Sequence, residues 1–116
     1  MQHLLHKTQF DAVLGTRPVA RTEHFFAHRL ADQPMAVGVM VPKRHAKRAV
    51  TRNLIKRQIY TLMSEAEKAD QLAIGAYLVR LRIVFDKSHF VSAASDALKA
   101  AVRAELQALI ASIVKK

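Results

Sequence analysis

The chain has 116 residues, the length of one domain, and 51% of them are hydrophobic, which is enough for a packed core and excludes a disordered basic tail. The 19 lysines and arginines against 9 acids give a formal charge of +10, which favours an anionic partner. The chain has no cysteine, no apolar run longer than residues 35–41 and no apolar N-terminal segment, which excludes disulfides, a membrane span and a signal peptide, so we expect one cytoplasmic domain over residues 1–116 that binds no membrane.

The N-terminal half predicts one short helix followed by two strands. Thr8 is the expected N-cap of the helix. Its apolar side would carry Phe10, Val13 and Leu14. Glycine and proline interrupt the next segment, which leaves room for one further short strand near Val19. Residues 24–30 predict a strand, and residues 35–41 predict a strand buried on both faces, because their apolar side chains are continuous and do not alternate with polar ones.

The C-terminal half predicts a helix, a strand and a second helix. Pro42 ends the preceding strand, and a helix should run from about residues 46–49 to about Glu67. Residues 76–85 contain the alternation Val-Arg-Leu-Arg-Ile, which is typical of a strand with one wetter face. A long helix should follow from about Phe90, with a buried sector formed by Leu98, Val102, Leu106, Leu109 and Ile113. The order α-β-β-(β)-α-β-α indicates an α+β domain in which helices pack on a small sheet.

The positive charge is concentrated in one segment. Seven of the 19 lysines and arginines lie between Lys43 and Arg57, and no acid lies among them. A solvated helix face usually mixes charges of both signs, which form stabilising i,i+4 pairs, whereas this segment repels itself. An anionic partner would relieve the repulsion, so we interpret the segment as a nucleic-acid-binding surface.

A helical wheel separates the predicted basic helix into a buried stripe and a basic sector. The stripe consists of Ile55, Ile59, Leu62 and Ala66. The basic sector, an arc of about 140° at 100° per residue, contains Arg52, Asn53, Lys56, Arg57 and Tyr60. The preceding loop extends the sector with Lys43, Arg44, Lys47 and Arg48. Guanidinium groups bind phosphate in a bidentate manner, and the Asn53 amide could contact a base edge, a 2′-hydroxyl or only its own backbone.

The basic segment resembles the signature of a known family. Residues 41–57 read Val-Pro-Lys-Arg-His-Ala-Lys-Arg-Ala-Val-Thr-Arg-Asn-Leu-Ile-Lys-Arg, which is similar to the motif of the bacterial ribonuclease P protein subunit. In that motif a strand ending in paired basic residues leads through a short basic loop to Arg-Asn-Arg-Ile-Lys-Arg on a helix. The matching positions are Gly38, Lys43, Arg44, Arg48, Ala49, Arg52, Asn53, Ile55, Lys56 and Arg57. The rest of the chain resembles the family more loosely, through its length, its first helix with Phe10 and its final strand and helix.

The resemblance implies an α+β fold with a left-handed βαβ crossover and two RNA-facing surfaces. The first surface would contact the catalytic RNA subunit through Lys43, Arg44, Lys47, Arg48, Arg52, Asn53, Lys56 and Arg57. The second, a cleft on the sheet beside the first helix, would hold the single-stranded 5′ leader of precursor tRNA through Phe10, Leu14, Phe26, His28 and Met40. Magnesium ions held by the RNA subunit would carry out the hydrolysis that removes the leader, and the protein itself would bind no cofactor.

Four positions depart from the family pattern. Leu54 and Tyr60 stand where the family has arginines, so two cations are missing from the helix. Leu14 and His28 replace aromatic residues of the cleft. Base stacking on an aromatic side chain is worth about 1–3 kcal/mol per base, so we expect a looser grip on the leader. Tyr60 could either stack on a base or cover the edge of the core.

The sequence predicts no catalytic residue and no metal site in the protein itself. The nine acids are scattered along the chain and do not form the paired carboxylates that a two-metal nuclease requires. The pairs His3 with His6 and His24 with His28 are weak candidates for metal ligands, because neither has a cysteine or a well-placed carboxylate beside it. His45 in the basic loop is expected to contact RNA or solvent.

Three other function classes remain open. A structural RNA-binding protein of the ribosomal type, without a role in cleavage, would share the charge and the size. A DNA-binding module would need a helix-turn-helix partner, whereas a strand precedes the basic helix, so no DNA partner is expected. An autonomous nuclease would have to cleave RNA without any RNA subunit.

Overall fold

The order of the predicted elements is confirmed in the computed structural model, which describes residues 2–3, 7–83 and 96–114. The elements are β1 (Gln2–His3), α1 (Lys7–Leu14), β2 (Pro18–Arg21), β3 (Phe25–Leu30), β4 (Ala36–Met40), α2 (Ala49–Lys68), β5 (Ala76–Leu81) and α3 (Asp96–Ile113). The short strand near Val19 is present as β2. The two-residue strand β1 was not predicted, because two residues carry no periodic signal.

The strands form one mixed sheet with β5 at its centre. The strand order is β1-β4-β5-β3-β2, in which β4 is parallel to β1 and β5, while β3 is antiparallel to β5 and β2. The prediction of a wetter face is confirmed in the second half of the strand, where Arg80 and Arg82 are partly buried while Val79 and Leu81 are buried; the first half, from Ala76 to Leu78, is buried on both faces. A central strand between two covered faces can be buried on both sides. Residues 84–85 and the predicted helix start near Phe90 lie outside the described residues.

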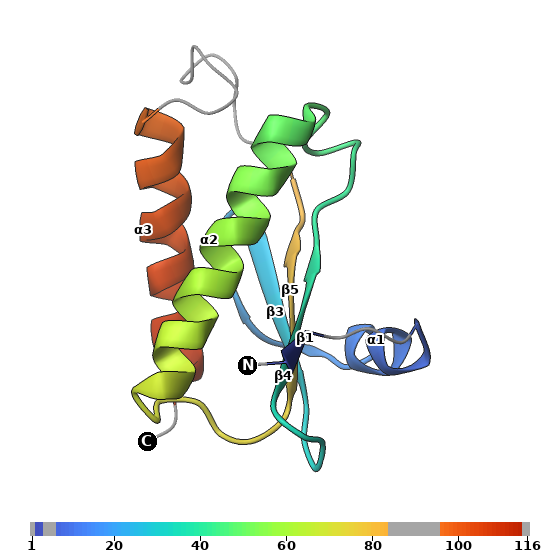
Figure 1. Ribbon diagram of the computed structural model, residues 1–116. Helices are drawn as coiled ribbons and strands as arrows, with labels where there is room; N and C mark the ends of the chain where they lie inside the picture. Colours follow the sequence, from blue (N-terminus) through green and yellow to red (C-terminus); the bar gives the residue numbers. More distant parts are fainter. Residues whose placement is uncertain (1, 4–6, 84–95, 115–116) are drawn as a thin grey trace.

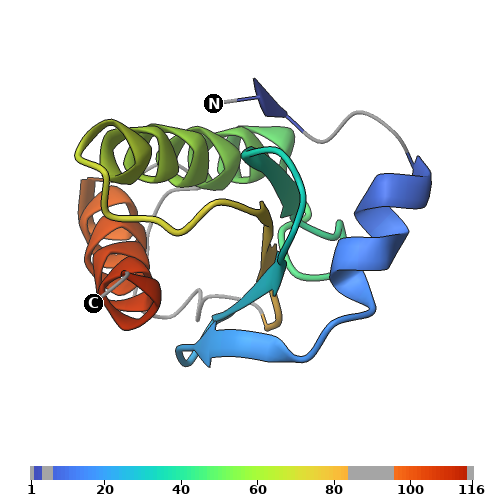
Figure 2. The ribbon, with the colours of Figure 1, turned by 90° about the horizontal axis from the view of Figure 1, so that it is seen from below.

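Helices cover the two faces of the sheet unequally (Figures 1 and 2). α2 and α3 lie side by side over one face, and α1 is the one helix of the described ranges that lies against the other. The larger core fills the space between the sheet and the helix pair, and includes Phe25, Val37, Ile55, Ile59, Tyr77, Val79, Val102 and Leu106. A smaller cluster under α1 consists of Val13, Ala76 and Leu78, with Phe10, Leu14, Leu30 and Met40 packed around it.

The helix boundaries confirm the predicted stripes and correct one cap. The predicted stripe of α2 is buried, and Leu54 and Met63 widen it. Four of the five residues in the predicted sector of α3 are buried, whereas Ile113 is only partly buried. α1 begins at Lys7, so Thr8 lies inside its first turn and is not the N-cap. Of the helices in the described ranges, none combines the length and the apolar character that crossing a bilayer would require.

The unit β4-α2-β5 crosses over with a left hand. In Figure 1 both parallel strands run upward, α2 lies to their left, and β4 lies in front of β5. Figure 2 shows the molecule from below, and in this view too β4 lies nearer than β5 to the side that faces the viewer in Figure 1. Seen from the side of α2 with both strands pointing upward, β5 therefore lies to the left of β4. The chain passes from β4 through α2 to this strand on the left, which is a left-handed crossover. Few βαβ units have this hand, and it agrees with the expectation drawn from the resemblance.

Candidate nucleic-acid interface

The loop between β4 and α2 displays its charged side chains outward because a buried residue anchors it. The carbonyl of Pro42 accepts hydrogen bonds from the N–H groups of His45 and Ala46, at 3.0 and 3.1 Å, and Ala46 is only 4% exposed. This tight turn leaves the flanking cations in solvent. The exposed cations of the segment from residue 43 to residue 57 are Lys43, Arg44, Lys47, Arg48 and Arg57. Asn53 is exposed as well, and Lys56 is partly buried.

Arg52 holds this loop against α2. Its Nη1 donates to the carbonyl oxygens of Ala46 and Lys47, at 3.0 and 2.8 Å, and the residue is partly buried. A guanidinium has five N–H donors, so this use leaves donors for a phosphate. The sequence predicted Arg52 as an RNA ligand, and the structure adds that it shapes the loop carrying the other ligands.

The N-terminus of α2 adds to the positive potential. Arg48 is the N-cap residue, its side chain makes no capping hydrogen bond, and the first turn contains no acid. The helix dipole places partial positive charge at this end, where it adds to the cations of the loop. Burial and the neighbouring Arg44 lower the pKa of His45. His45 is therefore neutral near pH 7, and the positive charge of the loop comes from its lysines and arginines.

The two departures from the family arginines contribute to packing. Leu54 is 8% exposed and belongs to the main core. The Tyr60 ring stacks on the His3 imidazole, with 4.0 Å between the ring centroids and an interplanar angle of 17°. Burial raises the pKa of the Tyr60 phenol. Of the two roles left open for Tyr60, covering the edge of the core is the one that these contacts support, and the stack ties β1 to α2.

The second group of predicted residues comes together on the α1 side of the sheet. The strand register places Phe26 and Met40 on either side of Arg80, and His28 beside Leu78. α1 packs on the same side. The structure therefore brings together all five residues predicted for the cleft, namely Phe10, Leu14, Phe26, His28 and Met40.

Considering the described residues alone, this sheet face is least covered at the end next to the basic loop. α1 lies beside the lower part of the sheet in Figure 1, over the buried Ala76 and Leu78. Phe26, Met40 and Arg80 lie toward the upper end and are partly buried. The basic loop leaves the top of β4 on the same side as α1 (Figures 1 and 2). The basic loop thus lies next to the less covered end of this sheet face, whereas α2 itself lies on the opposite face of the sheet.

His28 is too deeply buried to offer its ring to a base. It is 2% exposed, its Nδ1 donates to the carbonyl oxygen of Thr16 at 2.9 Å, and its Nε2 accepts from Nε of Arg80 at 3.0 Å. These two bonds require the neutral ring with its proton on Nδ1. Burial lowers the pKa of His28; the Thr16 hydrogen bond opposes this shift and the charge of Arg80 adds to it.

Two arginines that the sequence analysis did not select lie against Phe26. The guanidinium carbons of Arg80 and Arg82 are 4.4 and 5.0 Å from the centroid of the Phe26 ring, within the range of cation–π contact. Arg82 also donates from Nη1 to the carbonyl oxygen of Glu23, at 2.8 Å. The alternation over 79–83 showed that these side chains share a face. It could not show that Phe26, from a distant part of the chain, lies on that face too.

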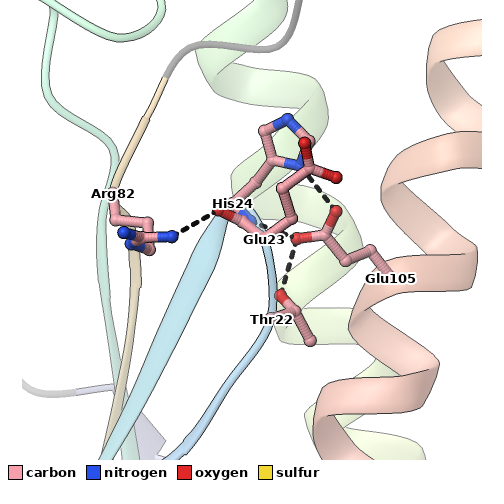
Figure 3. Close-up of polar contacts among 5 residues, drawn as sticks. All are labelled: Thr22, Glu23, His24, Arg82 and Glu105. Carbon is pink, nitrogen blue, oxygen red and sulfur yellow. Dashed lines mark hydrogen bonds and ion pairs between the residues drawn. The ribbon is translucent and has the colours of Figure 1, made fainter.

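The Glu105 carboxylate of α3 forms hydrogen bonds with the turn between β2 and β3 (Figure 3). Glu105 Oε2 accepts from the Thr22 hydroxyl at 2.6 Å and from the His24 backbone N–H at 2.7 Å, and Oε1 lies 2.6 Å from His24 Nδ1. Glu23, His24 and Glu105 offer possible metal-ligand atoms within 4.8 Å of one another. Both oxygens of Glu105 already take part in hydrogen bonds. We therefore interpret the group as a structural contact, named the Glu105 clasp, between α3 and the turn between β2 and β3. The prediction that no well-placed carboxylate lies beside His24 was wrong, because Glu105, from a distant part of the chain, contacts its ring.

Comparison with known proteins gives a consistent result. A family model described as "Ribonuclease P" matches residues 1–113. A "Ribonuclease P protein component" from Paraburkholderia xenovorans is 36% identical over 110 residues, which cover 92% of this chain and 76% of the relative. One of the same name from Ralstonia pickettii is 38% identical over 105 residues, which cover 87% of this chain and 71% of the relative.

Solved structures show the same fold at low sequence identity. The RNase P protein of Staphylococcus aureus superposes with a TM-score of 0.73 at 15% identity, covering 99% of each chain. That of Thermotoga maritima superposes with a TM-score of 0.68 at 17% identity, covering 99% of this chain and 100% of the other.

Proposed function

The chain belongs to the ribonuclease P protein family, and from this premise we propose that it binds the catalytic RNA of ribonuclease P and the 5′ leader of precursor tRNA, and so assists endonucleolytic removal of the leader in the cytoplasm. The observation that carries the proposal is an acid-free run of seven cations, five of them exposed, beside a partly open sheet face. This arrangement suits two RNA ligands at once.

The basic loop and α2 are the proposed contact with the RNA subunit. Phosphates of a folded RNA repel one another, and exposed lysines and arginines neutralise them and release counterions. Arg52 supports this role by fixing the loop, so less conformational entropy is lost when RNA binds. Asn53, exposed among these cations, can hydrogen-bond to a sugar or a base.

The α1 side of the sheet is the proposed contact with the leader. Phe10 and Phe26 supply aromatic surface, Leu14 and Met40 supply apolar surface, and His28 supports them from beneath. Single-stranded nucleic acid is commonly bound by aromatic side chains beside a cationic track. Mature tRNA lacks the leader, so a contact here would favour the precursor.

The proposal assigns the hydrolysis to the RNA subunit and its magnesium ions, and it assigns no catalytic residue, metal or cofactor to this chain. The protein would act by neutralising phosphates and by holding the leader so that the scissile bond lies at the RNA active site. This assignment of hydrolysis to the RNA and of binding to the protein is what the family resemblance implies, and it can be tested directly.

The test is cleavage of precursor tRNA at low magnesium by a bacterial ribonuclease P RNA with this protein, by that RNA alone, and by the protein alone. We expect cleavage at the leader junction only when RNA and protein are combined. Tight RNA binding without any gain in cleavage would favour a structural RNA-binding protein instead. Cleavage by the protein alone would show an autonomous nuclease.

A further inference from the structure

The polar pair His28 and Arg80 lies on the sheet face proposed to hold the leader. His28 is 2% exposed and has both ring nitrogens in hydrogen bonds, whereas Arg80 is partly buried and reaches the surface beside Phe26. A buried histidine cannot touch a ligand at the surface. It can affect binding only through a neighbouring side chain with which it forms a hydrogen bond. The group that His28 holds is the Arg80 guanidinium.

We propose that His28 is a positioning residue, which accepts a hydrogen bond from Nε of Arg80 and so keeps the Arg80 guanidinium on the Phe26 ring, where Arg80 makes the contact with the leader that the buried histidine cannot make. The inference rests on the proposed function, because the single-stranded leader is the ligand. In this inference Arg80 binds the leader directly. It also explains how the cleft can bind RNA although His28 stands where the family has an aromatic residue.

The geometry leaves Arg80 ready to bind nucleic acid. The bond to His28 uses Nε, so the two Nη groups keep donors for a phosphate. Its guanidinium carbon lies 4.4 Å from the centre of the Phe26 ring, so the ring and His28 together hold the group in place. A guanidinium fixed before binding loses less side-chain entropy when it takes up its ligand. A stacked guanidinium is also a surface on which a base can lie.

The arrangement depends on a neutral His28. Protonation would turn Nε2 from an acceptor into a donor, break the bond from Arg80 and place two cations side by side. Arg80 is the charged group in contact with His28. The charged side chains of α1 and of the segment around β2 are all exposed, namely Lys7, Asp11, Arg17 and Arg21. Since the pKa of His28 is lowered from its usual 6.5, the bond should persist at pH 7 and fail only in more acidic solution.

The experiment compares the dissociation constants of precursor and mature tRNA for the assembled RNA–protein complex, between about pH 5.5 and pH 8. We expect Arg80→Gln to weaken precursor binding about tenfold at pH 7.5 and to leave mature tRNA unchanged, because one charge-assisted contact is lost. His28→Phe, which keeps an aromatic ring and removes the acceptor, should give a similar loss. Combined with Arg80→Gln, it should add little, since both changes remove the same contact.

The conservative variant His28→Gln separates positioning from packing. Its side-chain oxygen can accept from Arg80 but does not titrate, so the preference for precursor should be retained at pH 7.5 and should not fall in acid as it does for the wild type. The matched control is Arg103→Gln, which removes the same charge from the exposed face of α3 and should leave the preference for precursor unchanged. Thermal unfolding and binding of the RNA subunit check that each variant is folded.

Two results would overturn the inference in different ways. A selective loss with Arg80→Gln but full precursor affinity with His28→Phe, or a wild-type pH profile that His28→Gln reproduces, would remove the positioning role and keep the leader site. Equal effects of Arg80→Gln and Phe10→Ala on precursor and mature tRNA would remove the leader site itself. If His28→Phe does not fold, the pH profiles of the wild type and His28→Gln still decide the question.

Discussion

Arg52 and Arg57 lie on the same helix and share the same side-chain chemistry, yet their surroundings give them different roles. Arg57 is exposed, whereas Arg52 donates two hydrogen bonds to the carbonyls of the preceding loop. Charge alone does not distinguish the two residues. The difference lies in which backbone oxygens come within reach, and this gives a prediction for each residue.

Arg57→Ala should weaken binding to the RNA subunit and lower the slope of log K against log salt by about one, because one phosphate contact is lost. The free energy of unfolding should hardly change. Arg52→Ala should reduce RNA binding and also destabilise the protein by about 1–2 kcal/mol, because the loop loses its hydrogen bonds. Salt-dependent RNA binding and urea unfolding measure the two effects, with Arg103→Ala as control. Identical unfolding for the two variants would contradict the assigned role of Arg52.

His28 also makes stability depend on pH. Its pKa is lowered in the folded protein from the usual 6.5, so around that pH the unfolded chain binds more protons than the folded one. Stability should therefore fall as the pH drops from about 7.5 through 6.5, and level off once the folded form is protonated too. Urea midpoints for the wild type and His28→Gln isolate this effect from His45, whose pKa is also lowered. Equal pH dependence for both proteins would be inconsistent with a neutral buried His28.

Among the helices and strands, the Glu105 carboxylate connects α3 to a turn in the N-terminal part of the chain. Glu105 accepts from Thr22 and from His24, which lie in the turn between β2 and β3. α3 otherwise packs through its apolar stripe, whose contacts are not directional. The hydrogen bonds of Glu105 are directional, so they help to set the position of α3 along the sheet.

Glu105→Ala should reduce the free energy of unfolding by about 1–3 kcal/mol, because several hydrogen bonds to a charged group are lost. Glu105→Gln keeps an oxygen that can accept from the Thr22 hydroxyl and the His24 N–H, so it should lose less. Urea unfolding measures both losses, and amide hydrogen exchange in α3 shows whether the helix loosens first. A free energy of unfolding that Glu105→Ala leaves unchanged would show that these hydrogen bonds contribute little to stability.

The elements that the sequence predicted best are those whose signal is local. Ile55, Ile59 and Leu62 recur at helical spacing, so α2 could be placed, and the cations beside them marked the basic surface. The group formed by Phe26, His28 and Arg80 could not be found in the same way, because a strand pairing between distant segments assembles it. The alternation from Val79 to Arg82 correctly marked the wetter face of β5, whereas the covering of Ala76 and Leu78 on that face depends on α1, which comes from a distant part of the chain.

For the whole molecule, the strand order makes β5 indispensable. β3 and β4 follow each other along the chain but do not pair with each other, and β5 lies between them and pairs with both. The buried side chains of β5 also contribute to both apolar clusters. No other strand of the described residues touches both halves of the sheet.

A chain that ends at Gly75 should therefore remain unfolded, although it contains the whole basic segment and most of the described elements. Circular dichroism and the dispersion of amide resonances would show this, with the full-length chain as the reference. A cooperative thermal transition in the shortened chain would mean that β3 and β4 can form a stable sheet without β5.

The central position of β5 also bears on how the protein is made. A ribosome delivers β3 and β4 long before β5, so the nascent chain carries two strands whose partner does not yet exist. Pairing between β3 and β4 at that stage would be a non-native hairpin, which must open before β5 can insert. The sheet can close only when synthesis is well advanced, and strand pairing over such long sequence separations is slow. Exposed strand edges in a strongly basic nascent chain make this interval the one in which misfolding or capture by a chaperone competes with folding.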